Sequence, residues 1–280
     1  MAADWTEAIE RARVNAPFLA SALERLPDIA DLLARGEGEA ALAAAAALRG
    51  DADPARGLRR ERLGHALALA IGDLAGAFPL ARVTGELSAL ADRALDAAMR
   101  EAVWRRVEGA EATGFIALAL GKHGAGELNY SSDIDPILLY DPTSLPRRER
   151  DEPGEAAQRY AREVVRLLAE NTSDGYVFRI DLRLRPASEV SPLALSVNAA
   201  LSHYETSALA WERAAFIRAR ACGGDVAAGE SFLDAIRPFV WRRSLDFGAI
   251  AEIERLTARI RETYTGPLTP QPVTAPQGRR

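Results

Sequence analysis

Two aspartates stand at the start of an apolar segment in the middle of this chain. Asp133 and Asp135 lie two residues apart, directly ahead of the run Ile137 to Tyr140. Alternate side chains of an extended strand leave the same face, so we expect both carboxylates to point into one space, about 7 Å apart along the backbone. Carboxylates so crowded repel each other unless a cation neutralises them. The pattern therefore predicts a strand that opens at a charged site.

A second segment supplies a third acid. The residues VFRIDLRLRP, from Val177 to Pro186, alternate between polar and apolar side chains, which predicts a strand. One face of this strand would carry Asp181, and it shares that face with Val177, Arg179, Arg183 and Arg185. Three converging acids ringed by arginines favour divalent cations with oxygen ligands and a phosphate group. Such a site suits phosphoryl or nucleotidyl transfer, in which two metals hold the attacking and leaving oxygens.

A glycine-rich loop precedes the two aspartates. The apolar run Phe115 to Leu120 predicts a buried strand, and it ends at Gly121. The glycine spacing after it fits neither the dinucleotide fingerprint nor the P-loop. We expect the loop amides and Lys122 to face a phosphate. A pair of solvated acids at a strand start is the alternative, and the loop upstream and the Asp-Arg segment downstream make it the weaker interpretation.

The order of predicted elements indicates an α+β fold, a small mixed sheet preceded and followed by α-helices. Helical patterns fill residues 1–111, where the Ala-rich run from Ala40 to Leu48 suggests close helix packing. Residues 112–192 form the core, which contains an amphipathic helix at 154–170. A C-terminal helical region follows at 193–264, with long helices expected at 198–220, from 230, and at 239–261. The Pro-rich tail at 265–280 is expected to be disordered.

Composition limits the function classes. The 280 residues are 48% apolar and 27% charged, as is usual in globular proteins. The net charge of −5 argues against general nucleic-acid binding, which needs a basic surface. No membrane span is expected, and the single Cys222, expected to be a packed thiol, fits a reducing cytoplasm. His65 and Trp104 are predicted to lie in the helical core.

The combined motifs resemble a known family. A strand, a Gly-Lys loop, an Asp-x-Asp pair and a third Asp on a later strand are similar to the polymerase-β-like nucleotidyltransferases. The segments GKHGAGELNYSSDID, DGYVFRIDLRLRP, WERAAFIRAR and PFVWRRSLDF resemble the glutamine synthetase adenylyltransferase family, over roughly Val14 to Ile260. The resemblance implies that residues 112–192 are a nucleotidyltransferase core. Two of these segments, FRIDLRLRP and PFVWRRSLDF, are more similar to the N-terminal, adenylyl-removing half of that family.

The resemblance also implies roles for single positions. Asp133, Asp135 and Asp181 match the catalytic acids that hold metal, expected to be two Mg²⁺ ions. The matches to the phosphate-binding or nucleotide-binding positions are Gly121, Lys122, Ser132, Arg183 and Arg185. Residues expected to brace the site are Glu127, Asn129, Glu212 and Arg213. Alternatives remain open for several of them: the two arginines could form ion pairs with Asp133 or Glu127, Ser132 could cap the strand entry, and Glu212 and Arg213 could form a structural salt bridge.

Three departures from the family pattern stand out. His123 replaces a usually apolar residue and is interpreted as an incidental loop histidine. Pro136 directly follows Asp135, removes a backbone donor, and suits a strand edge. The family continues into a regulatory segment and a second catalytic half, so we expect this chain to be a fragment or a split gene product.

The expected function is removal of AMP from an adenylylated tyrosine of glutamine synthetase. Inorganic phosphate would attack and ADP would leave, in the regulation of nitrogen assimilation. Expected partners are glutamine synthetase, ATP or ADP, phosphate, and a nitrogen-signalling regulatory protein acting through segments outside this chain; no nucleic acid or membrane is expected. Two alternatives remain: adenylyl transfer from ATP to the tyrosine, and a non-catalytic binding module.

Overall fold

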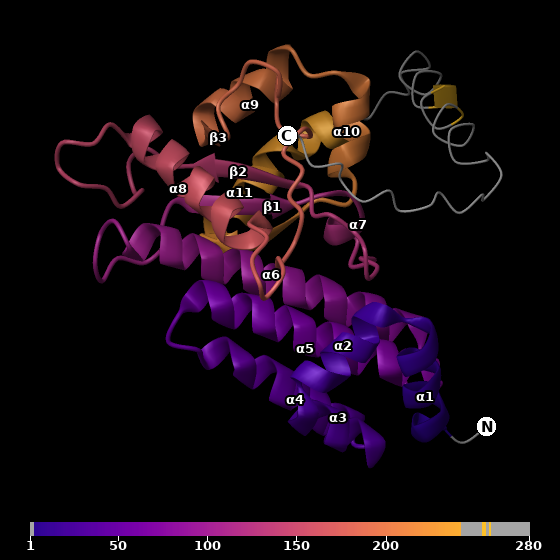
Figure 1. Cartoon of the computed structure of the whole chain (residues 1–280). Coiled ribbons are helices and arrows are strands. Elements are labelled where there is room, and N and C mark those ends of the chain that lie inside the picture. Colours follow the sequence, from indigo (N-terminus) through magenta and orange to yellow (C-terminus); the bar gives the residue numbers. More distant parts are fainter. Residues whose placement is uncertain (1–2, 242–253, 256–257, 259–280) are drawn as a thin grey trace, which may run out of the picture.

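A computed structural model describes residues 3–241, 254, 255 and 258 of the chain. Helices come first, a small sheet follows, and more helices pack on the far side of that sheet (Figure 1). This mixed arrangement confirms the predicted α+β class. Apart from residues 239–241, 254, 255 and 258, the helix expected at 239–261 lies outside the described residues. The tail expected to be disordered, from residue 265, also lies outside them.

The N-terminal region is a bundle of helices. Its elements are α1 (Trp5–Asn15), α2 (Pro17–Arg25), α3 (Pro27–Ala34), α4 (Gly38–Ala47), the 3-10 turn η1 (Leu48–Gly50), α5 (Pro54–Leu74) and α6 (Leu80–Trp104). Prolines open α2, α3 and α5, because a first helical residue needs no backbone N–H. The expected Ala-rich helix is α4. It packs closely on α5, since a Cβ built at Gly64 would lie 2.8 Å from the Cβ of Ala45.

Four strands of the described chain form one sheet in the order β3-β2-β1-β4. They are β1 (Phe115–Ala119), β2 (Pro136–Tyr140), β3 (Ala194–Ser196) and β4 (Arg220–Gly224). β1 pairs antiparallel with β2 and β4, and β2 pairs parallel with β3. The remaining elements are α7 (Gly121–Gly124), α8 (Pro153–Ala169), α9 (Val197–Thr206), α10 (Ala210–Phe216) and α11 (Val226–Val240).

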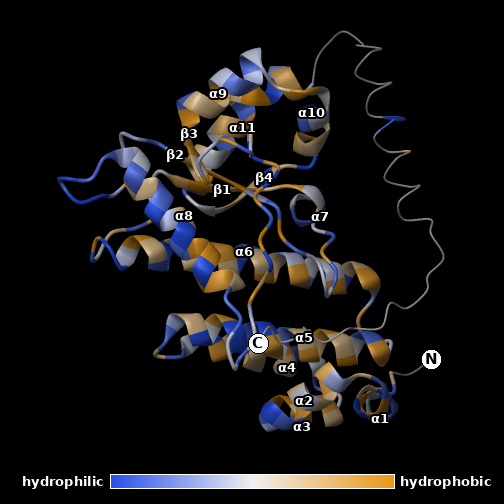
Figure 2. Ribbon diagram, turned by 45° about the horizontal axis from the view of Figure 1, so that its top comes forward, coloured by the Kyte–Doolittle hydropathy of each residue, from blue (hydrophilic) through white to orange (hydrophobic). Residues whose placement is uncertain are grey.

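Alternate side chains of the central strands feed two cores. Phe115, Ala117 and Ala119 of β1 belong to the larger core, which α6 and α8 share with the N-terminal helices. Ile116 and Leu118 turn the other way, into a smaller core shared with α9 and α11. The two central strands, β1 and β2, are hydrophobic along most of their length, as their orange colour in Figure 2 shows. The sheet is therefore a middle layer with a hydrophobic core on each face. Polar functional groups can lie only where its strands begin and end.

Two predicted elements are wrong. The helix expected at 198–220 is divided into α9 and α10, and β4 follows; β3 and β4 thus come from the region expected to be helical. The strand expected at 177–186 shrinks to one bridge, Ile134 to Ile180. The reason is local: the backbone N–H of Arg183 donates to Asp181 Oδ1 at 2.9 Å, and this Asx-type bond bends the chain out of the strand.

Three single-residue predictions also have outcomes. Cys222 and His65 are buried, as expected. Trp104, expected in the core, is 50% exposed; it is the last residue of α6, and its neighbour Val103 takes the buried position. Among the described helices, none combines the length and apolar character needed to cross a membrane.

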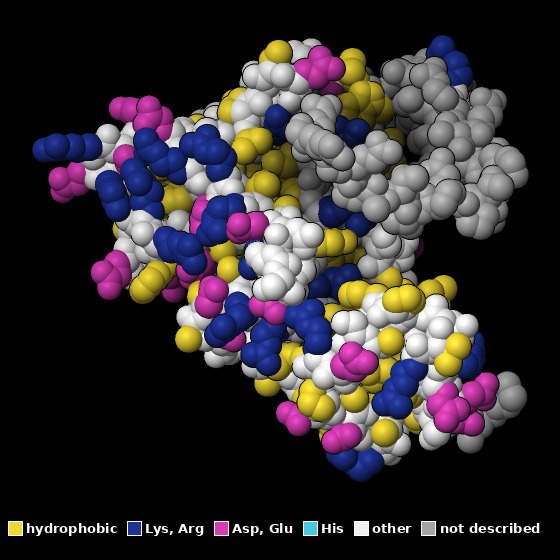
Figure 3. Space-filling view, viewed as in Figure 1, with side chains coloured by type: hydrophobic (Ala, Val, Ile, Leu, Met, Phe, Trp, Pro, Cys, Tyr) yellow, Lys and Arg dark blue, Asp and Glu magenta, His cyan; other side chains and the backbone are white. Residues whose placement is uncertain are grey.

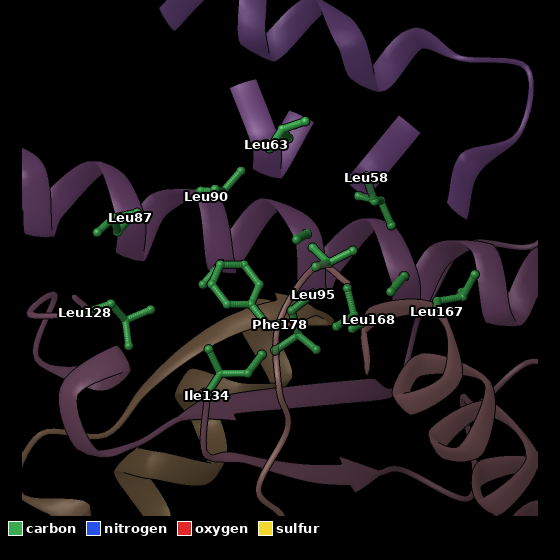
Figure 4. Packing of buried hydrophobic residues seen from close by; sticks show 14 of the residues in the cluster. Leu58, Leu63, Leu87, Leu90, Leu95, Leu128, Ile134, Leu167, Leu168 and Phe178 are labelled. Atoms are coloured by element: carbon green, nitrogen blue, oxygen red, sulfur yellow. The ribbon is translucent and has the colours of Figure 1, made fainter. Parts of the chain in front are cut away.

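The stability of this fold depends on the α6 face that meets the sheet. Leu95 is fully buried there, beside Phe178 in Figure 4. We expect Leu95→Ala to lower the free energy of unfolding by about 2–5 kcal/mol, because a cavity would remain in a close-packed core. Urea unfolding followed by circular dichroism measures this. Leu80→Ala on the same helix is the control: Leu80 is 74% exposed, so its loss should change little. Equal effects of the two substitutions would contradict the assigned core.

Candidate metal and phosphate site

The three acids named from the sequence meet at one end of the sheet. One carboxylate oxygen from each of Asp133, Asp135 and Asp181 lies within 4.8 Å of the other two. Asp133 is exposed and the other two are half-buried. Such a group of hard oxygen ligands could hold a metal ion.

A two-residue bridge brings the acids together. The N–H of Ile134 donates to Arg179 O at 3.0 Å, and the N–H of Asp181 donates to Ile134 O at 2.9 Å. Ile134 is fully buried and points into the core beside Phe178 (Figure 4). Because neighbouring side chains of an extended segment face opposite ways, burial of Ile134 directs Asp133 and Asp135 outward. The bridge then places Asp181 next to them.

The pKa values of two of the acids shift in opposite directions. Burial, followed by the charges of Asp133 and Asp181, raises the pKa of Asp135 to about 6. The hydrogen bonds from Arg183 lower the pKa of Asp181. The half-buried Asp135 therefore lacks a full counter-charge, although Arg183 and Lys122 offset part of the repulsion. An added cation would remove this deficit.

Gly121 lets the loop approach these acids. It opens α7 with a φ of +57°, a conformation that L side chains rarely adopt, and a Cβ there would lie 3.2 Å from Asp135 Oδ2. Its neighbour Lys122 is exposed and acts electrostatically on Asp135. The structure thus brings the loop expected to face a phosphate alongside the acids.

His123 is not an incidental loop residue, so that interpretation was wrong. Its side chain is fully buried, and its Nε2 lies 2.7 Å from Asp92 Oδ1 on α6. Arg220 of β4 donates to both Asp92 oxygens, at 2.8 and 2.9 Å, and to the carbonyl of His123 at 3.2 Å. Asp92 and Arg220 therefore fasten the glycine loop to α6 and β4. Neither was found from the sequence, because they lie 31 and 97 residues from His123 and belong to no motif.

Pro136 is accommodated at the start of strand β2, directly after Asp135. It is the first residue of β2, pairs with Ala119 of β1, and is flanked by β3 only from Leu138 onward. A first strand position tolerates the missing N–H. The strand is nonetheless not an edge strand, because β2 lies between β1 and β3.

The two arginines have different partners. The Nε of Arg183 donates to both oxygens of Asp181, at 2.9 and 2.7 Å, and its Nη2 also contacts Oδ2. Its side chain is 84% exposed, so it can turn to a ligand. Arg185 does not share that face: its guanidinium donates to four nearby backbone carbonyls, that of Leu182 before it and those of Ser188, Ser191 and Pro192 after it. A phosphate contact by Arg185 would require these bonds to break.

The loop before Asp133 is held by its own side chains. Ser132 donates to Asn129 Oδ1 at 2.9 Å and accepts from the Asn129 N–H at 3.1 Å. Glu127 pairs with Arg218 at 3.0 Å rather than with the site arginines. Ser132 and Asn129 thus shape the entry to the acidic pair.

Glu212 and Arg213 lie in the other core layer. Glu212 is buried, bonds His203 Nε2 at 2.8 Å, and accepts from the Leu209 N–H that opens α10. Arg213 stacks on Phe239 at 5.6 Å. These contacts hold α9, α10 and α11 together. Glu212 and Arg213 do not form an ion pair with each other.

The raised pKa of Asp135 predicts a measurable stability effect. A carboxyl that titrates near 6 in the folded chain and near 3.8 when unfolded destabilises the fold as pH rises through that window. Without divalent cations, Asp135→Asn should therefore be more stable than the wild type at pH 7.5, by about 1–3 kcal/mol, and this gain should vanish near pH 4. Urea unfolding in chelator at both pH values measures it. A loss of stability at pH 7.5 would contradict the crowded site.

Comparison with known proteins identifies related sequences. Residues 7–235 match the family model of glutamate-ammonia ligase adenylyltransferase. Curated proteins named bifunctional glutamine synthetase adenylyltransferase/adenylyl-removing enzyme are similar. The protein of Caulobacter vibrioides is 46% identical over 82% of this chain, and that of Xanthobacter autotrophicus is 44% identical over 78%. The protein of Bradyrhizobium diazoefficiens is 42% identical over 87% of the chain.

This chain spans about a quarter of the length of those relatives: 25%, 23% and 25% in the three cases. The matched segment includes every residue of the acidic site. The family model covers well over half of the chain, and the acids, the glycine loop and the mixed sheet lie inside the match. The chain belongs to the glutamate-ammonia ligase adenylyltransferase family.

Proposed function

We propose that this chain carries one nucleotidyltransferase site that removes AMP from an adenylylated tyrosine of glutamine synthetase by phosphorolysis. The observation that carries the proposal is the convergence of three carboxylates from two segments beside Gly121. The family supports nucleotidyl transfer on glutamine synthetase. The similarity of FRIDLRLRP to the adenylyl-removing half supports this direction over adenylyl transfer from ATP.

The acidic site fits magnesium. It offers hard oxygen donors within 4.8 Å of one another, and the raised pKa of Asp135 indicates a local excess of negative charge. Asp133, Asp135 and Asp181 would hold the ions. Bound there, two magnesium ions would neutralise charge on the phosphoryl group and on the departing tyrosyl oxygen.

The remaining residues would bind and orient the substrates. Lys122 and the backbone of the Gly121 loop would face the adenylyl phosphate. Arg183, which is exposed and lies beside the acids, would guide inorganic phosphate through the forked geometry that arginine favours. An oxygen of inorganic phosphate forms a bond to the adenylyl phosphorus, and the bond from phosphorus to the tyrosyl oxygen breaks. ADP and an unmodified tyrosine result, and the tyrosinate takes a proton from solvent.

The activity itself provides the first test. Asp133→Asn and Asp181→Asn should each abolish ADP release from adenylylated glutamine synthetase in the presence of phosphate and magnesium, because each removes a metal ligand. Asp234→Asn is the matched control, since Asp234 lies exposed on α11 in the other core layer. Unchanged turnover in either site variant would contradict the assignment.

The same assay decides the direction. Labelled ATP with unmodified glutamine synthetase tests the reverse reaction. Incorporation of label without phosphorolysis would favour the adenylyl-transfer alternative. A chain inactive in both directions that still binds glutamine synthetase would favour a binding module.

Magnesium binding is predicted independently of turnover. Calorimetric titration at pH 7.5 should show saturable magnesium binding to the wild type and to Asp234→Asn. For Asp135→Asn we expect at least about tenfold weaker binding, since a carboxylate ligand becomes a neutral amide. Identical affinities for wild type and Asp135→Asn would rule out the proposed ligand set.

A further inference from the structure

A cavity lies away from the acids, between the helical bundle and the segment that follows α8. It has a volume of about 390 Å³ and is lined by α2, α5 and the turn at residues 171–176. In Figure 1 the chain after α8 descends across α6 toward α5, and hydrogen bonds fix it there: Arg59 donates to Glu170 O at 3.1 Å. The volume is in the range of small-molecule sites.

Arg62 lines this cavity without an ionic partner. No carboxylate of the described residues lies within 4.0 Å of its guanidinium, and its buried Nε has no hydrogen-bond partner. Its contacts are one hydrogen bond from Nη2 to Tyr130 O at 2.9 Å and the ring of Phe178 at 5.4 Å. Burial lowers the pKa of Arg62, and the like charge of Arg179 lowers it further. The side chain of Arg62 is half-buried. A cation that is partly removed from water and has no ionic partner is stabilised when an anion joins it.

The surroundings add positive charge rather than cancel it. Arg179 adjoins the cavity rim, where its Nη1 donates to the hydroxyl of Tyr176 at 3.1 Å, and it has no carboxylate partner in the described structure either. Of the other two arginines in the lining, Arg25 is paired with Asp174 at 2.7 Å, and Arg59 lies 3.7 Å from Glu170. The unpaired cations are therefore Arg62 and Arg179.

Aromatic side chains complete the cavity wall. Phe18 is 58% exposed and Tyr176 is 40% exposed, and both line the space. Large exposed aromatics beside an unpaired arginine are typical of a ligand site, where a flat or apolar part of the ligand covers them. Space-filling Figure 3 shows dark blue Lys and Arg side chains gathered at the junction of the bundle with the upper layers.

We propose that the cavity between α2, α5 and residues 171–176 binds a small anion, a phosphate or carboxylate compound, through the guanidinium of Arg62. The site is distinct from the three acids, but it touches the same segment. Arg62 and Arg179 donate to the successive carbonyls of Tyr130 and Ser131, which stand just before Asp133. An anion bound to Arg62 would therefore alter the contacts of the loop that leads to Asp133 and Asp135.

Calorimetry on the full chain in chelator tests the proposal, with inorganic phosphate and malonate as the two probes. At least one probe should bind at millimolar concentration, and Arg62→Gln should weaken that binding at least tenfold. Which probe binds more tightly separates phosphate from carboxylate ligands. Arg60→Gln is the matched control: Arg60 lies two residues before Arg62 on α5 and pairs with Asp51 outside the cavity.

Two further results decide between sites. Phosphate binding that survives Arg183→Gln but not Arg62→Gln supports the cavity. Binding lost in Arg183→Gln and retained in Arg62→Gln would place the anion at the acidic site and overturn the proposal. The proposal would also be overturned if neither probe bound. Thermal unfolding without a probe checks that Arg62→Gln is folded. Arg62→Lys, which keeps the positive charge, is a second variant. We expect it to bind the probe more weakly than the wild type and more tightly than Arg62→Gln.

Discussion

The site depends on one short bridge between two segments that are far apart in the sequence. Two backbone hydrogen bonds join Ile134 to the Arg179–Asp181 segment, and the buried side chain of Ile134 locks that junction into the core. Without the bridge, Asp181 would not lie within reach of the other two acids. A pairing of two residues thus sets the chemistry, while the four-stranded sheet and its helices hold the pairing in place.

Holding three acids together has an energetic cost that the rest of the structure offsets. The raised pKa of Asp135 reflects this cost directly. Arg183 compensates one acid, and the bonds of the buried His123 and of Arg220 to the half-buried Asp92 fix the glycine loop that approaches another. Strain of this kind is common where a site is preorganised for a charged ligand. Stability and function oppose each other at Asp135.

Short sequence patterns correctly predicted those features that depend on neighbouring residues alone. Alternation around Ile134 was sufficient to place Asp133 and Asp135 on one side, and the Ala-rich α4 followed its helix propensity. Prediction failed where distant partners or a side chain overrode the pattern. β4 contains two glycines and few apolar residues, so only its neighbour β1 makes it a strand. The Asx bond of Asp181 ended a strand that its alternation favoured. Asp92 could not be linked to His123 from the sequence, because their contact depends on the packing of α6.

The central claim is that three side chains from two segments hold divalent cations at one point. A crystal structure grown with Mn²⁺, a spectroscopically and anomalously visible substitute for Mg²⁺, tests it most directly. We expect anomalous density between the carboxylates of Asp133, Asp135 and Asp181. Manganese bound elsewhere, or an Asp181 carboxylate turned away from a metal held by the other two, would contradict it.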